Sequence, residues 1–141
     1  MDEQETGAGE GRPRARADRL RGRRVLAAIE SPQWAARYAI DGDALSRWSS
    51  GFSDPQWLRV DLGRPYRLTT VTLKWENAYG MRYRVETSLD GATWHTLWST
   101  TSGHGGTVGV PAAGTAARYV RMYGTQRVNQ YGFSLYEVEV R

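Results

Sequence analysis

Turn-forming residues constrain the fold of this chain more than any other feature of its sequence. From Val25 onward, Gly, Pro, Asn and Asp divide the chain into short apolar runs, and no helical period persists through them. Short runs with this punctuation predict the strands of a β-sandwich or barrel. A chain of 141 residues has room for one hydrophobic core. We therefore expect one all-β domain over residues 25–141.

The run over residues 57–62 alternates apolar and polar side chains. Leu58, Val60 and Leu62 fall on one face of this run, which predicts a half-buried strand. Gly63-Arg64-Pro65 follows at once and is expected to end the strand. Three tryptophans are expected to fill the core of the domain: Trp48, Trp57 and Trp75.

A hairpin is predicted further along the chain. Residues 68–75 alternate again, and a loop over residues 76–80 separates them from the next run, residues 83–89. Asp90-Gly91 then supplies a turn that favours positive φ and leads into the return strand at residues 94–98.

Residues 1–24 read differently from the rest of the chain. Seven arginines lie between Arg12 and Arg24 against one acid, and Leu20 is the only large aliphatic residue beyond Met1. Such a segment buries too little surface to offset chain entropy, so we expect a disordered basic tail or linker. It lacks interleaved aromatics, a base-reading motif and an apolar face. We therefore expect no contact with nucleic acid or membrane from it.

Two absences narrow the function further. The chain has no cysteine, which excludes a disulfide framework, a thiolate metal site and a cysteine nucleophile. No stretch approaches the roughly twenty apolar residues that span a bilayer, and acidic residues follow Met1 where a signal peptide would be basic and then apolar.

Six landmarks now occur in a recognisable order. They are residues 39–43 with 46–50, 55–63, 75–80, 88–94, 117–124 and 131–140. With these landmarks the chain resembles the coagulation factor V/VIII type C, or discoidin, domain family, and most of all its bacterial carbohydrate-binding modules. It departs from the family at residues 27–34, which lack the usual Ser/Thr-rich entry. It also lacks the disulfide of vertebrate members.

The resemblance implies a jelly-roll-like sandwich of about eight strands, similar to galactose-binding domains, with a ligand held by loops at one end. It implies a monomeric module that recognises a poly- or oligosaccharide without chemistry and targets a tethered glycoside hydrolase to it. Such a protein is expected to be extracellular, as part of a secreted chain. Adhesion to a phospholipid membrane or a protein is the alternative, although the polar loop at residues 76–80 counts against lipid.

Sugar binding needs an aromatic platform together with charged or amide groups that bond to hydroxyls. The residues expected to supply them lie at or beside strand ends: Glu30, Arg47, Phe52, Glu76, Asn77, Tyr79 and Tyr131. Alternatively, Arg47 pairs with an acid at the core edge and Tyr131 is scaffold. Trp34 is either a further platform or a plug over the core.

The sugar itself stays open at this point. Glu30 and Glu76 favour a cationic, chitosan-type glucosamine polymer, whereas Arg47 and Asn77 favour a neutral galactose-type or β-glucan sugar. Glu30 and Glu76 on a wet loop surface do not resemble the buried carboxylate pair of a glycosidase, and His95 and His104 stand apart from each other. We therefore expect no enzymatic activity.

Asp41-Gly42-Asp43 with Ser46 offers oxygen ligands for calcium or, alternatively, a hydrogen-bonded turn. It is not an EF-hand, because Phe52 stands where such a loop needs a bidentate acid. The resemblance implies a structural Ca²⁺ ion held by residues of this loop and of the last strand. These are Tyr38 and Asp43 through their carbonyls, Asp41, Ser46, the carbonyl of Tyr136, and Glu137.

Overall fold

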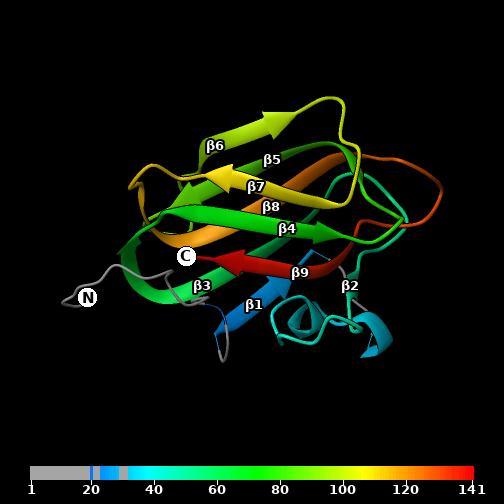
Figure 1. The fold of residues 1–141 in the computed structure, drawn as a ribbon, viewed down its shortest axis with the longest axis horizontal. Coiled ribbons are helices and arrows are strands. Elements are labelled where there is room, and N and C mark those ends of the chain that lie inside the picture. The colour runs from blue at the N-terminus through cyan, green and yellow to red at the C-terminus, as the bar shows by residue number, and fades with distance from the viewer. Residues whose placement is uncertain (1–19, 21–22, 29–31) are drawn as a thin grey trace.

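The computed structural model of the chain describes residues 20, 23–28 and 32–141, which form two packed antiparallel sheets (Figure 1). The strands are β1 (Arg24–Ala27), β2 (Trp48–Ser49), β3 (Gln56–Arg67), β4 (Thr70–Trp75), β5 (Gly80–Ser88), β6 (His95–Thr100), β7 (Thr107–Pro111), β8 (Ala116–Arg127) and β9 (Ser134–Val140). Two short 3-10 helices, η1 (Pro32–Trp34) and η2 (Ala36–Ala39), precede β2. One sheet has the order β1-β3-β8-β5-β6 and the other β2-β9-β4-β7. The expected all-β sandwich is confirmed.

The core lies between the two sheets because each strand turns its apolar residues to the same side. Leu58, Val60 and Leu62 of β3 are buried, and so are Trp48 and Trp75. The expectation for Trp57 was wrong. Trp57 precedes Leu58 in an alternating strand, so its side chain lies on the outer face of the sheet, where it is half-buried.

The predicted hairpin is confirmed. Strands β5 and β6 pair antiparallel, with Thr87 opposite His95, and Gly91 in the turn has a φ of 77°. Asp90 accepts hydrogen bonds from the backbone N–H groups of Thr93 (2.8 Å) and Ala92 (2.9 Å). These bonds, led by the one from Thr93, lower the pKa of Asp90 to about 2. The turn therefore keeps its acceptor across the neutral pH range.

Strand β3 does not end at Gly63, as the sequence suggested. It continues to Arg67, and its pairing with β8 shifts register between Asp61 and Tyr66. Gly63 takes a φ of 88°, so residues 63–65 form a bulge within the strand. Gly and Pro mark an irregularity here, while pairing on either side of it carries the strand through.

The first described residues pack against the sandwich. Leu20 is fully buried within the core cluster, and the N–H of Arg23 donates to its carbonyl at 2.9 Å. Leu20 was expected to lie in a disordered tail. The rest of that segment, residues 1–19 and 21–22, lies outside the described residues.

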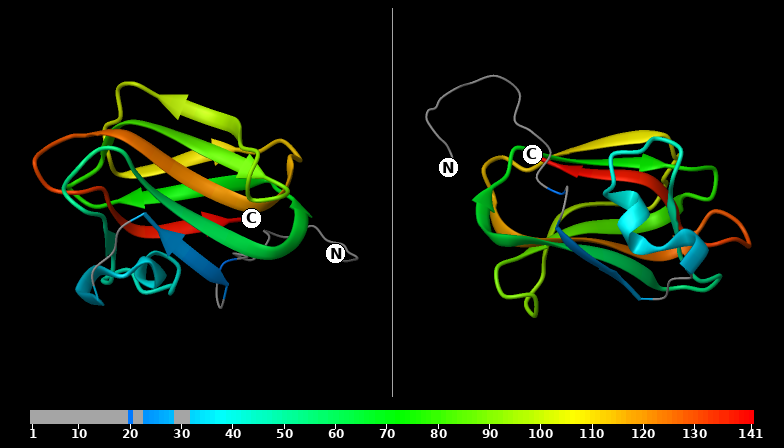
Figure 2. Two further views of the ribbon diagram at one scale, coloured as in Figure 1. Left: turned by 180° about the vertical axis from the view of Figure 1, so that it is seen from behind. Right: turned by 90° about the horizontal axis from the view of Figure 1, so that it is seen from below.

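One end of the sandwich gathers loops from both sheets. In Figures 1 and 2, η1, η2 and β2 lie at this end together with the β4–β5 and β8–β9 connections, while the C-terminus lies at the other end. The described chain contains no helix with the length and apolar character needed to cross a membrane.

Candidate functional site

A pocket of about 410 Å³ opens at the loop end of the sandwich. Its walls come from η1, β2 and the loops that follow β2, β4 and β8. The lining residues are Trp34, Arg47, Ser49, Phe52, Glu76, Asn77, Ala78, Asn129 and Tyr131. Segments that are far apart in the sequence therefore build one hollow, with aromatic, charged and amide groups around it.

Arg47 is held in this wall by its neighbours. It directly precedes Trp48, which is fully buried and pairs with Leu135 of β9. Its guanidinium carbon lies 4.1 Å from the centre of the Trp34 ring, a cation–π contact. The Nε atom of Arg47 is buried and has no hydrogen-bond acceptor among the described residues. The guanidinium of Arg47 is thus fixed beside the pocket, and not all of its N–H groups have acceptors among the described residues.

This contact bears on the alternative roles expected for Arg47 and Trp34. No ion pair joins Arg47 to an acid in the part of the chain that the structure describes. Trp34 is half-buried and lines the pocket, so it is a wall of the site and not a plug over the core.

Glu76 and Asn77 follow the end of β4, where the backbone is tied to β9. The N–H of Glu76 donates to the Ser134 carbonyl (3.0 Å), and the Ser134 N–H donates to the Ala78 carbonyl (2.8 Å). The Ala78 N–H in turn donates to Oε1 of Glu76 at 3.1 Å. These three bonds fix the carboxylate of Glu76 at the pocket wall.

Phe52 and Tyr131 form an aromatic rim. Their ring centroids are 6.0 Å apart at an interplanar angle of 84°, and both side chains are exposed. The two loops that carry them are tied together by Asp54, whose Oδ1 accepts from the backbone N–H and from Nε of Arg127, both at 3.2 Å. Asn129 accepts the N–H of Tyr131 at 3.0 Å and sets the turn before the rim.

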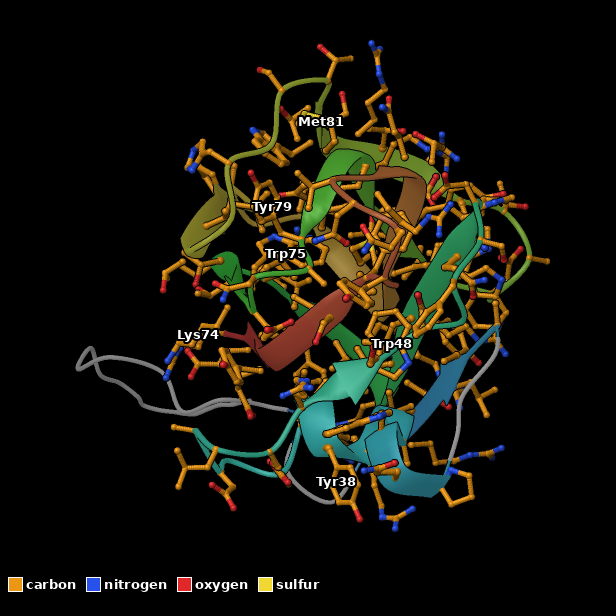
Figure 3. The ribbon with its side chains drawn as sticks, turned by 90° about the vertical axis from the view of Figure 1, so that its right-hand side faces the viewer. Tyr38, Trp48, Lys74, Trp75, Tyr79 and Met81 are labelled. Carbon is orange, nitrogen blue, oxygen red and sulfur yellow. The ribbon has the colours of Figure 1, made fainter. Side chains whose placement is uncertain are left out.

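Five of the seven predicted sugar contacts therefore meet at one pocket: Arg47, Phe52, Glu76, Asn77 and Tyr131. Tyr79 does not line it. Its ring packs against the core and against Gly105, where an added Cβ would lie 2.7 Å from the ring. Figure 3 views this end of the molecule, with Trp48 and Trp75 lying between Tyr38 and Tyr79. Glu30 lies outside the described residues.

Sequence reasoning missed Ser49, Ala78 and Asn129 as pocket residues. Ala78 and Ser49 carry no sequence signal of their own. Asn129 does, because Asn in a short polar turn just before an aromatic commonly bonds to the backbone two residues on.

Residues 38–46 form a separate cluster of oxygen atoms. The hydroxyl of Ser46 lies 2.5 Å from Oδ2 of Asp41, 3.2 Å from the Asp43 carbonyl and 3.4 Å from the Tyr38 carbonyl. One hydroxyl proton can satisfy only one of these three acceptors. Oε2 of Glu137 in β9 accepts the Gly42 N–H at 3.1 Å and closes the cluster from the other side.

The types of ligand atom in this cluster determine which kind of metal ion it could hold. The described residues contain no group of three or more His, Cys, Asp or Glu side chains able to hold a metal. Carbonyl, hydroxyl and carboxylate oxygens, however, are the ligands that calcium takes. Tyr136 stands beside Glu137 in β9, where its carbonyl was expected to contribute.

Glu76 is the only carboxylate among the residues that line the described pocket. Glycosidases need two carboxylates facing each other across the scissile bond. The lining can hold and orient a sugar through its rings, its guanidinium and its amides, but it supplies no acid–base pair.

Comparison with known proteins shows which family and which solved structures this chain is similar to. The F5/8 type C domain profile matches residues 26–138. Among solved structures, chitosan-binding module 1 of a chitosanase/glucanase from Paenibacillus sp. IK-5 has 34% identity and a TM-score of 0.86, covering 89% of this chain and 99% of the module. Module 2 of the same enzyme, solved with chitotriose, has 33% identity and a TM-score of 0.83, covering 87% of this chain and 98% of the module.

A curated relative is a much longer protein. The polysaccharide lyase 8 family protein HylA of Enterococcus faecalis is 35% identical over 75 residues, which are 53% of this chain and 5% of HylA. The chain thus spans a small fraction of the length of that relative.

Proposed function

Because the chain belongs to the F5/8 type C domain family, as a non-catalytic carbohydrate-binding module, we propose that its pocket binds a glucosamine-type oligosaccharide of chitosan. The observation that carries the proposal is one pocket in which Glu76 and Arg47 lie among the rings of Trp34, Phe52 and Tyr131. Two chitosan-binding modules with at least 33% identity over most of their length support the choice of sugar.

Each side chain has a distinct role in this proposal. Glu76 has one oxygen engaged by Ala78, and its negative charge pairs with the ammonium group of a glucosamine unit. Arg47 donates to hydroxyl and ring oxygens, because a guanidinium has donors only. The exposed faces of Phe52 and Tyr131 cover the apolar C–H surface of a sugar ring.

Replacing Glu76 by Gln is expected to weaken binding of a glucosamine trisaccharide about tenfold, since a charge-assisted bond contributes about 1.5–3 kcal/mol and its neutral replacement keeps part of this. Titration calorimetry measures the effect. The matched control is the fully N-acetylated trisaccharide, which has no ammonium group and should bind both proteins alike. Equal losses for the two sugars would refute the charge pairing. Tighter binding of galactose or a cello-oligosaccharide by the native protein would refute the sugar assigned.

We further propose that the module acts outside the cell as part of a longer chain that degrades polysaccharide. Shallow single sites of this kind bind weakly. Tethering an enzyme to its polymer then raises the local concentration of substrate without any new contact at the catalytic centre. The similarity to modules of a chitosanase/glucanase supports this setting.

We also propose a structural Ca²⁺ ion in the cluster at residues 38–46. The fit rests on Ser46, whose single proton faces three oxygen acceptors, because a cation at their centre would satisfy all of them at once. The ion would tie this loop to Glu137 of β9. It would thereby brace Arg47 and β2, which follow this loop in the chain, β2 being paired with β9.

Chelation tests the calcium site. A ligand at a hundred times its Kd stabilises the native state by about 2.7 kcal/mol. Removing calcium with EGTA should therefore lower the Tm by about 5–10 °C, as measured by scanning calorimetry. Asp41→Ala should start at the lower Tm and show no response to EGTA. A native protein whose Tm is the same in EGTA and in calcium would contradict the proposal.

A further inference from the structure

The outer face of the five-stranded sheet carries arginine and aromatic side chains that the sugar pocket does not use. Across β3, β8 and β5, Arg59 lies opposite Arg121, and Arg121 lies opposite Glu86. In the next row, Tyr123 lies opposite Arg84. Figure 2 (left) shows this sheet from outside, with β8 and β3 nearest the viewer. We define the arginine–aromatic face by Arg59, Arg84, Arg121, Tyr119, Tyr123 and Trp94.

The guanidinium groups of this face are held on aromatic rings. The Cζ atom of Arg121 lies 4.0 Å from the ring centre of Trp94 and 4.9 Å from that of Tyr123. The Cζ atom of Arg84 is 4.5 Å from the Tyr123 ring, and that of Arg59 is 5.7 Å from the Tyr119 ring. Such stacking fixes flexible side chains in advance, so a ligand that bonds to them orders less of the protein.

Most of the negative charge near this face is already engaged. Glu86 is buried and accepts from Nε of Arg84 (2.9 Å) and Nε of Arg121 (2.7 Å). At the edge of the face, Asp61 accepts two bonds from Arg118, at 2.9 and 3.1 Å. Both carboxylates therefore serve arginines that lie beside or above them.

Arg59 is the exception. Its Nη1 donates weakly to the Gly91 carbonyl at 3.4 Å, and no carboxylate lies within ion-pair distance of it in the described chain. The nearby Asp90 accepts hydrogen bonds from the backbone N–H groups of its own turn. Arg59 also stands directly opposite Arg121, and like charges in that position repel. The face therefore has an uncompensated positive charge at Arg59, on the strand next to the one that carries Arg121.

We infer that the arginine–aromatic face is a second binding surface, for an acidic polysaccharide whose uronate carboxylates lie over Arg59 and Arg121. A carboxylate matches the planar fork of arginine and relieves the repulsion between the pair. The faces of the rings are already occupied by guanidinium groups. This favours recognition of carboxylates over the stacking of bases from a single-stranded nucleic acid.

Polygalacturonate is the probe for this surface, in native affinity electrophoresis at low salt. Arg59→Glu should weaken binding at least about tenfold, because it replaces an attraction by a repulsion at the centre of the face. Arg64→Glu is the matched control, since Arg64 also lies over a tyrosine, 4.6 Å from the Tyr66 ring, but on the bulge of β3. It should bind nearly as the native protein does. Arg59→Glu should leave the glucosamine trisaccharide affinity within about twofold.

Four results would overturn the inference. One is that polygalacturonate does not slow the migration of the native protein at low salt. Another is that Arg64→Glu loses as much affinity for polygalacturonate as Arg59→Glu does. A third is a loss caused by Arg47→Ala alone, which would place the polymer in the pocket. The fourth is tighter, Arg59-dependent binding of a single-stranded oligonucleotide than of polygalacturonate. Three of these results leave the glucosamine site untouched, and the third concerns the pocket itself, where the glucosamine trisaccharide titrations with Glu76→Gln and Arg47→Ala decide the sugar separately.

Discussion

Replacing Arg47 by Ala is expected to weaken binding of a glucosamine trisaccharide by about 10- to 150-fold, the largest effect of any single pocket change. Hydrogen bonds from a charged group contribute about 1.5–3 kcal/mol, and this range sets the fold-change. The guanidinium is already held over Trp34 at 4.1 Å, and its buried Nε has no acceptor among the described residues. The sugar is expected to accept hydrogen bonds from the terminal N–H groups of this guanidinium with little further ordering of the protein.

Arg47→Lys separates charge from geometry in the same titration. Lysine keeps the positive charge but lacks the planar fork and stacks less well, so we expect it to restore less than half of the lost binding free energy. Arg67→Ala serves as the control, because Arg67 is exposed and bonds to the Gly114 carbonyl, away from the pocket. An Arg47→Ala protein that is folded and binds with unchanged affinity would show that the pocket is not the sugar site.

Replacing Leu20 by Ala is expected to lower the free energy of unfolding by about 2–5 kcal/mol, as for other fully buried leucines. Leu20 has no exposed surface and belongs to the same core cluster as Leu62 and Leu68. Because the sandwich is stabilised by packing without disulfides, the loss is a large part of the total. Urea denaturation measures it.

The matched control lies on the first strand of the fold. Leu26 of β1 is 46% exposed, so Leu26→Ala should change the free energy of unfolding by at most about 1 kcal/mol. Equal effects of the two substitutions would contradict the packing of Leu20.

The strands and the hairpin of the fold could be predicted because each depends on residues that are close together in the sequence. Alternation over residues 57–62 and 68–75 and the Asp90-Gly91 turn each depend on neighbours in sequence, so they predict strands and a hairpin correctly. Leu20 has no such pattern, because one leucine among arginines shows no period. Its burial depends on a core built entirely by residues that follow it.

The structure differs from expectation at Trp57, at β3 and in the placement of Tyr79, because contacts with segments distant in sequence decide each of these features. An alternating strand shows which residues share a face but not how much of the outer face is covered, so Trp57 looked like a core residue. Gly63 and Pro65 mark irregular backbone, and only the partner strand β8 decides between an end and a bulge. Tyr79 lies at a strand end like the true pocket residues, but the Gly105 loop covers its ring.

The pocket was predictable in part for a related reason. Loops that join strands at one end of a sandwich must come close together, so polar and aromatic residues at Arg47, Glu76 and Tyr131 could be expected to meet. Ser49 and Ala78 could not be expected, because their place in the lining depends on how β2 and the loop after β4 pack against β9.

Two-dimensional ¹H–¹⁵N NMR of the six tryptophan indole groups, during titration with a glucosamine trisaccharide, tests the central claim most directly. Trp34 lines the pocket, whereas Trp57 and Trp94 lie on the outer side of the five-stranded sheet and Trp98 on β6. We expect the Trp34 signal to shift in proportion to occupancy, while those of Trp57, Trp94 and Trp98 stay in place. Saturating sugar that leaves Trp34 unchanged and moves the others would contradict the account.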